Sequence, residues 1–198
     1  MEQANVRLLI KRAVQACFLV YAFPAALLCG FGRIAVLFSL SAQWFALFPG
    51  FFGSFARAAF YKMTLADCSI DVVIGLGSYF SRSAAIVGPN VSIGSYCIIG
   101  NATIGARSQI SSHVDIPGGR SQHIRDARGR LSDTLEASGT PLVIGEDCWI
   151  GAAAVVMANV GSQSTIGAGS VVVREIPSGK VAIGAPARPV KSSYQPPG

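Results

Sequence analysis

The chain has 198 residues and a formal net charge of +6; 51% of its residues are hydrophobic and 13% are charged. This length allows one domain with an additional segment, but the charged fraction is about half of that in an average soluble domain. No basic block is interleaved with aromatic residues, so we expect no nucleic-acid partner. The excess of apolar residues is concentrated near the N-terminus.

Residues 1–65 contain two uncharged stretches, Ala13 to Gly32 and Ile34 to Ala56, separated by Arg33. At 1.5 Å per residue, each stretch is long enough to cross a hydrocarbon layer of about 30 Å. The pattern predicts an apolar α-helical membrane hairpin with Arg33 at an interface. A cleaved signal peptide and a buried soluble hairpin are the alternatives. Pro24 and Pro49 would kink or shorten the helices, so a re-entrant hairpin in one leaflet fits the sequence equally well.

Basic residues flank the hairpin on both sides: Arg7, Lys11, Arg12, Arg57 and Lys62. Because Lys and Arg are enriched in cytoplasmic segments, both ends of the hairpin are expected on the cytoplasmic side of the membrane. The domain that follows would then face the cytoplasm. The five cysteines form no CxxC pair, and an odd, scattered set suits a reducing compartment.

An isoleucine or valine recurs about every six residues over most of the chain after residue 86, usually followed by glycine. A six-residue repeat is typical of a parallel β-helix, in which three short strands form one coil of about 18 residues. We therefore predict a mainly β solenoid over 66–191, with residues 192–198 as a tail. The residue four positions after the aliphatic is small, as expected if both share a narrow lumen: Cys97, Ser108, Cys148, Ala154 and Ser170.

The repeat is interrupted over 117–142 by a polar segment with four arginines. An insertion of this length in a regular solenoid is typically functional or disordered. His123 lies in the insertion, and the other histidine of the chain, His113, precedes it on the coil. A histidine can take a proton from a hydroxyl or an amine at neutral pH. The chain has no GxSxG motif, which disfavours a covalent intermediate.

Three motifs carry a resemblance to a known family: IGEDCWIGAAAVV (Ile144 to Val156), IGAGSVVVREIP (Ile166 to Pro177) and GAPARPVK (Gly184 to Lys191). The chain resembles the hexapeptide-repeat, or left-handed β-helix, acyltransferases over about residues 70 to 191, and in particular the sugar and polysaccharide O-acetyltransferases. The resemblance implies a homotrimer with active sites between neighbouring β-helices, acetyl-CoA as donor and no metal.

The resemblance also implies site residues. The family's histidine base maps to His123, although His113 remains an alternative. Coenzyme contacts map to the backbone of Ala152 and Ala168, and the phosphates to basic residues near the C-terminus: Arg174, Arg188 and Lys191. Trp149 is expected to pack at a coil edge, and Asp115 either orients a histidine or is simply exposed on a strand.

The apolar N-terminal region departs from the simpler soluble members of this family. We therefore expect a glycan acceptor that is itself lipid-linked, such as a polyprenyl-linked precursor, and direct acetyl transfer to one of its sugar hydroxyls. An N-acetyltransferase or small-molecule O-acetyltransferase of the same fold, and a non-catalytic membrane scaffold, are the alternatives. A γ-type carbonic anhydrase would need three zinc-binding histidines, and the chain contains two.

Overall fold

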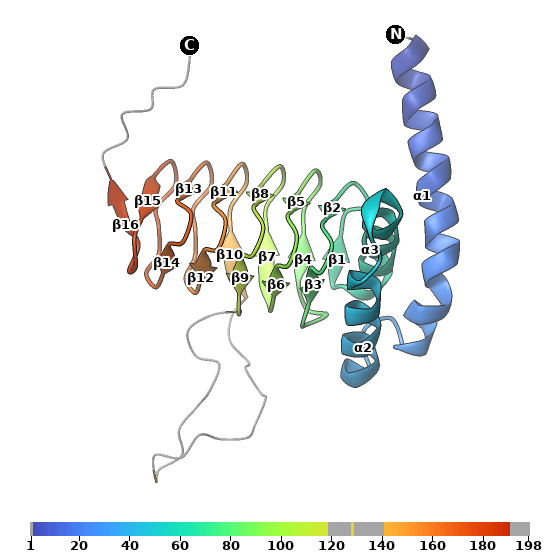
Figure 1. Ribbon diagram of the computed structural model, residues 1–198, viewed down its shortest axis with the longest axis horizontal. Helices are drawn as coiled ribbons and strands as arrows, with labels where there is room; N and C mark the ends of the chain where they lie inside the picture. The colour runs from blue at the N-terminus through green and yellow to red at the C-terminus, as the bar shows by residue number, and fades with distance from the viewer. Residues whose placement is uncertain (1, 119–127, 129–140, 191–198) are drawn as a thin grey trace.

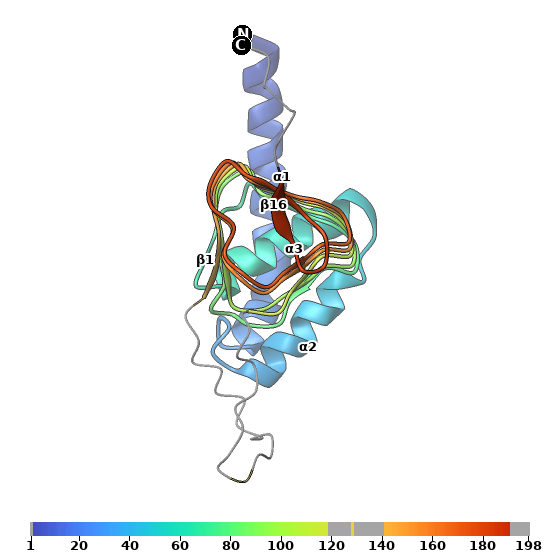
Figure 2. The same cartoon turned by 90° about the vertical axis from the view of Figure 1, so that its left-hand side faces the viewer.

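The computed structural model describes residues 2–118, 128 and 141–190. Three N-terminal helices are followed by a parallel β-helix, a three-sided prism whose short strands stack along one axis (Figures 1 and 2). The helices lie at the end of the prism formed by the first coil, and the C-terminal strand β16 lies at the opposite end. The predicted mainly β solenoid is therefore confirmed.

The strands form three sheets, named A, B and C. Sheet A contains β1 (Asp67–Cys68), β4 (Ile86–Val87), β7 (Ala102–Ile104) and β10 (Leu142–Ile144). Sheet B contains β2 (Val73–Ile74), β5 (Ser92–Ile93), β8 (Gln109–Ile110), β11 (Trp149–Ile150), β13 (Thr165–Ile166), β15 (Val181–Ile183) and β16 (Arg188–Val190). Sheet C contains β3 (Tyr79–Phe80), β6 (Ile98–Ile99), β9 (Asp115–Ile116), β12 (Val155–Val156) and β14 (Val171–Val172).

Each coil takes one strand from each sheet, so β1–β3 form the first coil, β4–β6 the second, β7–β9 the third and β10–β12 the fourth. The fifth coil contains β13 and β14. The pairing is parallel throughout except between β15 and β16, which are antiparallel. The inserted segment begins after β9 and ends before β10, so it separates the third coil from the fourth.

The lumen of the β-helix is filled by alternating large and small side chains. Ile110 pairs with Ile150, and Ile150 pairs with Ile166, which gives an aliphatic ladder inside sheet B. All five predicted small lumen residues are buried: Cys97, Ser108, Cys148, Ala154 and Ser170. Ser108 donates a hydrogen bond to the carbonyl oxygen of Gly145 at 2.8 Å, so its hydroxyl is satisfied inside the apolar lumen.

The N-terminal region differs in part from the predicted hairpin. The first uncharged stretch lies in α1 (Glu2–Leu28), but the second divides into α2 (Ala35–Ala46) and α3 (Gly50–Thr64). Pro49 precedes α3 in an extended conformation, as a residue before a helix start commonly is. Among the described helices, α1 over Val6–Leu28 is long and apolar enough to cross a membrane, and α2 is shorter.

The helices pack across the end of the prism, where they cover the first coil (Figures 1 and 2). The middle of α1 is attached to this coil, because Lys11 and Arg12 form ion pairs of 2.7 and 2.9 Å with Asp71. Gln15 donates a hydrogen bond to the carbonyl oxygen of Ile70 at 3.1 Å. The helix therefore lies along the covered end of the solenoid.

Arg57, one of the basic residues that flank the apolar stretches in the sequence, is buried in the structure. It is 1% exposed, and its guanidinium donates hydrogen bonds to carbonyl oxygens of Ile74, Phe45 and Phe48. Phe45 lies in the last turn of α2 and Phe48 just beyond it, where carbonyl groups lack helical partners. The sequence did not predict this burial, because the acceptors belong to α2, the residues just beyond it and β2.

Candidate functional site

The turns that connect sheet B to sheet C stack along one edge of the prism, here called the B–C edge (75–78, 94–97, 111–114, 151–154 and 167–170). Tyr96, His113 and Ala153 occupy equivalent positions in successive turns, each with a positive φ near 60°. Backbone hydrogen bonds connect the turns. His113 N–H donates to Ser95 at 2.8 Å, and Ala153 N–H donates to Ser112 at 3.0 Å.

His113 presents an exposed imidazole on the third coil. Its ring is stacked on Tyr96, with ring centroids 5.3 Å apart and planes inclined by 13°. On the fourth coil, the equivalent position holds only the methyl group of Ala153. Side chains on the B–C edge are therefore large on the second and third coils and small on the fourth. Within the described residues, no side chain hydrogen-bonds to the imidazole, so its ring is positioned there by stacking alone.

Asp115 lies two residues after His113, on the outer side of β9. Its pKa is raised by partial desolvation. In the described part of the chain this carboxylate makes no ion pair or hydrogen bond with His113. The geometry therefore agrees with an exposed strand position for Asp115 and does not provide an orienting partner for His113.

The two predicted coenzyme-contact alanines lie on the same edge as His113. Ala152 is on the fourth coil and Ala168 on the fifth, both exposed, and Gly169 N–H donates to the Ala152 carbonyl at 2.8 Å. A Cβ added to Gly151 would come within 2.4 Å of the Ala168 nitrogen, so glycine allows the close stacking. On this edge Ala152 and Ala168 continue the position of Ser112, beside the column formed by Tyr96, His113 and Ala153, and both alanines leave the backbone accessible.

The basic residues are distributed differently. Arg174 is exposed in the turn that connects sheet C to sheet A, the edge from which the insertion also leaves. Arg188 is exposed in β16, paired with Ile183 at the C-terminal end of sheet B. His123 and Lys191 lie outside the described residues. Over the described ranges, no three His, Cys, Asp or Glu side chains are grouped so that they could hold a metal ion.

Two aromatic residues near His113, Trp149 and Tyr96, lie where the sequence analysis did not place them. Trp149 was expected to pack at a coil edge, but it is 57% exposed on the outer face of sheet B. Its Nε1 donates a hydrogen bond to the Ser111 hydroxyl at 3.3 Å, next to the His113 turn. Tyr96 was not predicted as a site residue. Aligning the coils would have found it, because it precedes His113 by one coil.

Comparison with known proteins places these coils among acetyltransferase sequences. Residues 141–174 match the family described as the hexapeptide repeat of succinyl-transferase. A 2,3,4,5-tetrahydropyridine-2,6-dicarboxylate N-acetyltransferase of Clostridium perfringens is 47% identical over 57 residues, 28% of this chain and 24% of that protein. The bifunctional protein GlmU of Synechococcus is 33% identical over 119 residues, 58% of this chain and 26% of that protein.

The crystal structure of a maltose O-acetyltransferase from Clostridium difficile superposes with a TM-score of 0.60 at 19% identity. The match covers 82% of this chain and 89% of that structure, and shows a shared fold. The chain spans about a quarter of the length of the curated relatives it matches. The homologues and structural neighbours are acetyltransferases.

Proposed function

We propose that this protein is an acetyl-CoA-dependent O-acetyltransferase that acts on a sugar hydroxyl of a lipid-linked polysaccharide or glycan precursor. The supporting observation is the position of the matched segment. Residues 141–174 form the fourth and fifth coils, which follow the insertion containing His123 and stack directly on the coil of His113. A transferase repeat therefore stacks on the coil of His113 and follows, in the sequence, the insertion that contains His123.

The proposed chemistry is direct acyl transfer. A neutral imidazole removes the proton of the acceptor hydroxyl while its oxygen attacks the thioester carbonyl carbon. The tetrahedral intermediate then collapses, the carbon–sulfur bond breaks, and the imidazolium returns the proton to the leaving thiolate. The products are the acetyl ester and free coenzyme A. Such a base contributes about 10²–10⁴ in rate.

We assign the base to His123 and keep His113 as the alternative. A catalytic imidazole is commonly oriented by a hydrogen bond to its second nitrogen. At His113 the described residues offer a stacked ring, Tyr96, but no hydrogen-bond acceptor for the imidazole. This surrounding suits a packing or substrate-contact role better than proton transfer.

The proposed coenzyme site combines two edges of the prism. Ala152 and Ala168 would receive the pantetheine arm along the B–C edge, since small residues let it approach the backbone. Arg174 lies on a different edge, and Arg188 lies at the end of sheet B. Arginine suits the phosphates of the coenzyme, and we assign Lys191 the same role. A site between protomers of a homotrimer would bring basic residues of one copy toward the alanines of the next.

For residues 1–65 we propose membrane association, with 66–191 as the transferase domain on the cytoplasmic side. α1 is attached through Lys11 and Arg12 to Asp71 of the first coil. If α1 crossed the bilayer, this attachment would draw the first coil toward the hydrocarbon region. The contacts therefore favour a helix lying in the interface of one leaflet, with its apolar side in lipid, over a hairpin that crosses twice.

The proposal is tested with the full-length protein in vesicles of phosphatidylglycerol and phosphatidylethanolamine. Release of coenzyme A from acetyl-CoA is measured with free glucose, with glucosamine and with a polyprenyl-phosphate-linked glucose. We expect faster turnover on the lipid-linked sugar, and about a 10²-fold or greater loss in His123→Ala. His113→Ala should retain most of the activity.

Each other result has a distinct meaning. Preference for the amine of glucosamine would favour an N-acetyltransferase. Equal rates on free and linked sugars would refute the lipid-linked acceptor. Absence of transfer to every acceptor, with the protein folded and bound to vesicles, would favour a non-catalytic scaffold.

A further inference from the structure

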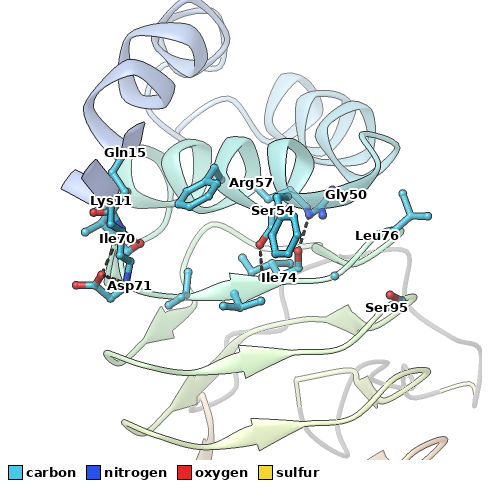
Figure 3. A pocket seen from close by; sticks show the side chains of 15 residues that line it. Lys11, Gln15, Gly50, Ser54, Arg57, Ile70, Asp71, Ile74, Leu76 and Ser95 are labelled. Atoms are coloured by element: carbon cyan, nitrogen blue, oxygen red, sulfur yellow. Dashed lines mark hydrogen bonds and ion pairs between the residues drawn. The ribbon is translucent and has the colours of Figure 1, made fainter. Parts of the chain in front are cut away.

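A groove of about 510 Å³ runs between helix α3 and strand β2, where the helical layer meets the first coil (Figure 3). One end is polar, with Lys11 and Gln15 of α1 beside Asp71. The other end is formed by Leu76 and by Ser95 of the next coil. The groove therefore extends from the helices proposed to associate with the membrane to the wall of the prism.

Most of the groove is apolar, with Phe51, Phe55, Ile70, Val73 and Leu76 among its lining residues. Two of these side chains are open to solvent, since Phe51 is 86% exposed and Val73 is 55% exposed. Exposed apolar surface of this kind marks an interaction site more often than a chance arrangement. The geometry thus provides a hydrocarbon-lined channel that is accessible at the start of α3.

The polar end of the groove is closed by protein contacts. Asp71 is held by Lys11 at 2.7 Å and by Arg12 at 2.9 Å, and Gln15 donates to the same carboxylate at 3.2 Å. These charges are satisfied within the described protein, so this end offers little to an apolar group. A chain entering beside Phe51 would accordingly extend toward the Leu76 end.

The Leu76 end is continuous with the B–C edge. Leu76 accepts a hydrogen bond from Tyr96 N–H at 2.8 Å, and Ser95 accepts one from His113 N–H at 2.8 Å. The groove thus ends one coil before His113 and two coils before Ala152. With strand spacings of about 4.8 Å, the end of the groove lies roughly 10 Å along the edge from the first proposed coenzyme contact.

We propose that this groove binds the hydrocarbon chain of an amphiphilic acceptor and places its head group at the third coil. This inference rests on the proposed acetyl transfer and deepens it by assigning the acceptor's approach. The acceptor would arrive from the helical end of the prism, while the coenzyme extends from the C-terminal coils. Their reacting groups would meet on the B–C edge, at the third and fourth coils.

The position of the groove, like its apolar lining, favours a membrane-held hydrocarbon chain as the bound molecule. Phe52, next to the groove residue Phe51, is 78% exposed, so apolar surface extends beyond the groove on the same helix. A molecule with its chain in a leaflet could enter there without its chain passing through water. A free sugar would gain nothing from this lining, because its hydroxyl groups would lose water without hydrogen-bonding partners.

The test uses alkyl glucosides as defined probes, below their micelle concentrations, with the full chain. Butyl, octyl and dodecyl glucoside are compared by equilibrium dialysis and, separately, as acetyl acceptors. Since each buried methylene contributes about 0.8 kcal/mol, two methylenes can tighten binding by up to about fifteenfold. We expect affinity and kcat/KM both to rise with chain length.

Val73→Glu places a carboxylate in the groove at an exposed position that tolerates a larger side chain. It should abolish the chain-length dependence of both binding and kcat/KM, so that dodecyl glucoside becomes no better an acceptor than butyl glucoside. The matched control is Ile86→Glu, an outward position of sheet A that is 39% exposed and does not line the groove. This control should keep the chain-length dependence. It also accounts for alkyl chains that adsorb to other apolar surface.

Two results would overturn the inference. Chain-length dependence that persists in Val73→Glu would place the chain elsewhere. Groove-dependent binding with equal kcat/KM for butyl and dodecyl glucoside would show that the bound chain belongs to a lipid other than the acceptor. Failure of the proposed function has a different signature, because no glucoside would be acetylated even though dodecyl glucoside still bound in the groove.

Discussion

Arg57 in α3 donates a hydrogen bond from Nε to the carbonyl oxygen of Ile74 in β2, at 3.0 Å. Its Nη1 donates to Phe48 at 2.8 Å and to Phe45 at 3.1 Å, at the C-terminal end of α2. One buried cation thus joins α2, α3 and the first coil. A positive charge is favourable at a helix C-terminus because of the helix dipole, which offsets part of the desolvation cost that lowers the pKa of Arg57.

Replacing Arg57 by methionine should therefore destabilise the protein strongly. Methionine fills much of the same space but removes the guanidinium donor to the carbonyl groups of Ile74 and Phe48, and leaves Phe45 with the Phe48 N–H alone, at a cost on the order of 3 kcal/mol. Urea unfolding measured by circular dichroism checks this. Lys62→Met is the control: Lys62 is half-exposed, its pair with Asp67 is 3.7 Å long, and the expected change is below about 1 kcal/mol. Similar losses in the two variants would contradict the joining role of Arg57.

Asp71 should make the attachment of α1 sensitive to acid. Its hydrogen bond to Lys11, with those to Gln15 and Arg12, lowers its pKa below the usual value near 3.9. A lowered folded-state pKa contributes stability that is present above the unfolded pKa and is lost as pH falls through the folded value. The Tm advantage of the native protein over Asp71→Asn should therefore be full above about pH 5 and decline below about pH 4. A Tm difference that stays constant from pH 6 to pH 3 would contradict this linkage.

The cysteines should differ sharply in reactivity. Cys17 is exposed on α1, whereas Cys29, Cys68, Cys97 and Cys148 are buried. Burial raises the pKa of the Cys68 thiol to about 12, which leaves almost no thiolate at neutral pH. Mass spectrometry after N-ethylmaleimide treatment should show one adduct in the folded protein, absent in Cys17→Ser, and four more after denaturation. Rapid labelling of a second thiol in the folded protein would be inconsistent with this packing.

The solenoid was predictable because its physical rule is local. Each two-residue strand places one aliphatic residue inward, as Ile93 and Ile150 show, so the period of the sequence is the period of the fold. The small residues that follow, such as Cys97 and Cys148, were predicted for the same reason and are 0% and 1% exposed. No long-range information was needed.

The helical layer could be predicted only in part. An uncharged stretch has the same composition whether it lies in lipid or covers the end of a solenoid. The break at Pro49 was expected from proline, but the burial of Arg57 depends on its contact with Ile74 of the first coil. In the candidate site, the common edge that carries His113, Ala152 and Ala168 required the coils to be aligned in space. The long insertion hides the adjacency of the third and fourth coils, so Trp149 could not be placed beside the His113 turn from sequence spacing alone, whereas Tyr96 precedes His113 by one uninterrupted coil.

Two neighbouring residues of β11 test which face of the strand is buried. Ile150 faces the lumen and is 0% exposed, whereas Trp149 faces outward and is 57% exposed. Ile150→Ala should remove a rung between Ile110 and Ile166 and leave a cavity, at a cost of about 2–5 kcal/mol. Trp149→Ala removes a larger side chain, but most of that side chain is exposed. The substitution also removes one hydrogen bond to Ser111, 3.3 Å long, so the expected cost is about 1 kcal/mol or less. Urea midpoints at constant m-value compare the two free energies of unfolding. A larger loss in the tryptophan variant would mean that the outer face of sheet B is covered, which is the result expected if this face packs against a second copy of the chain.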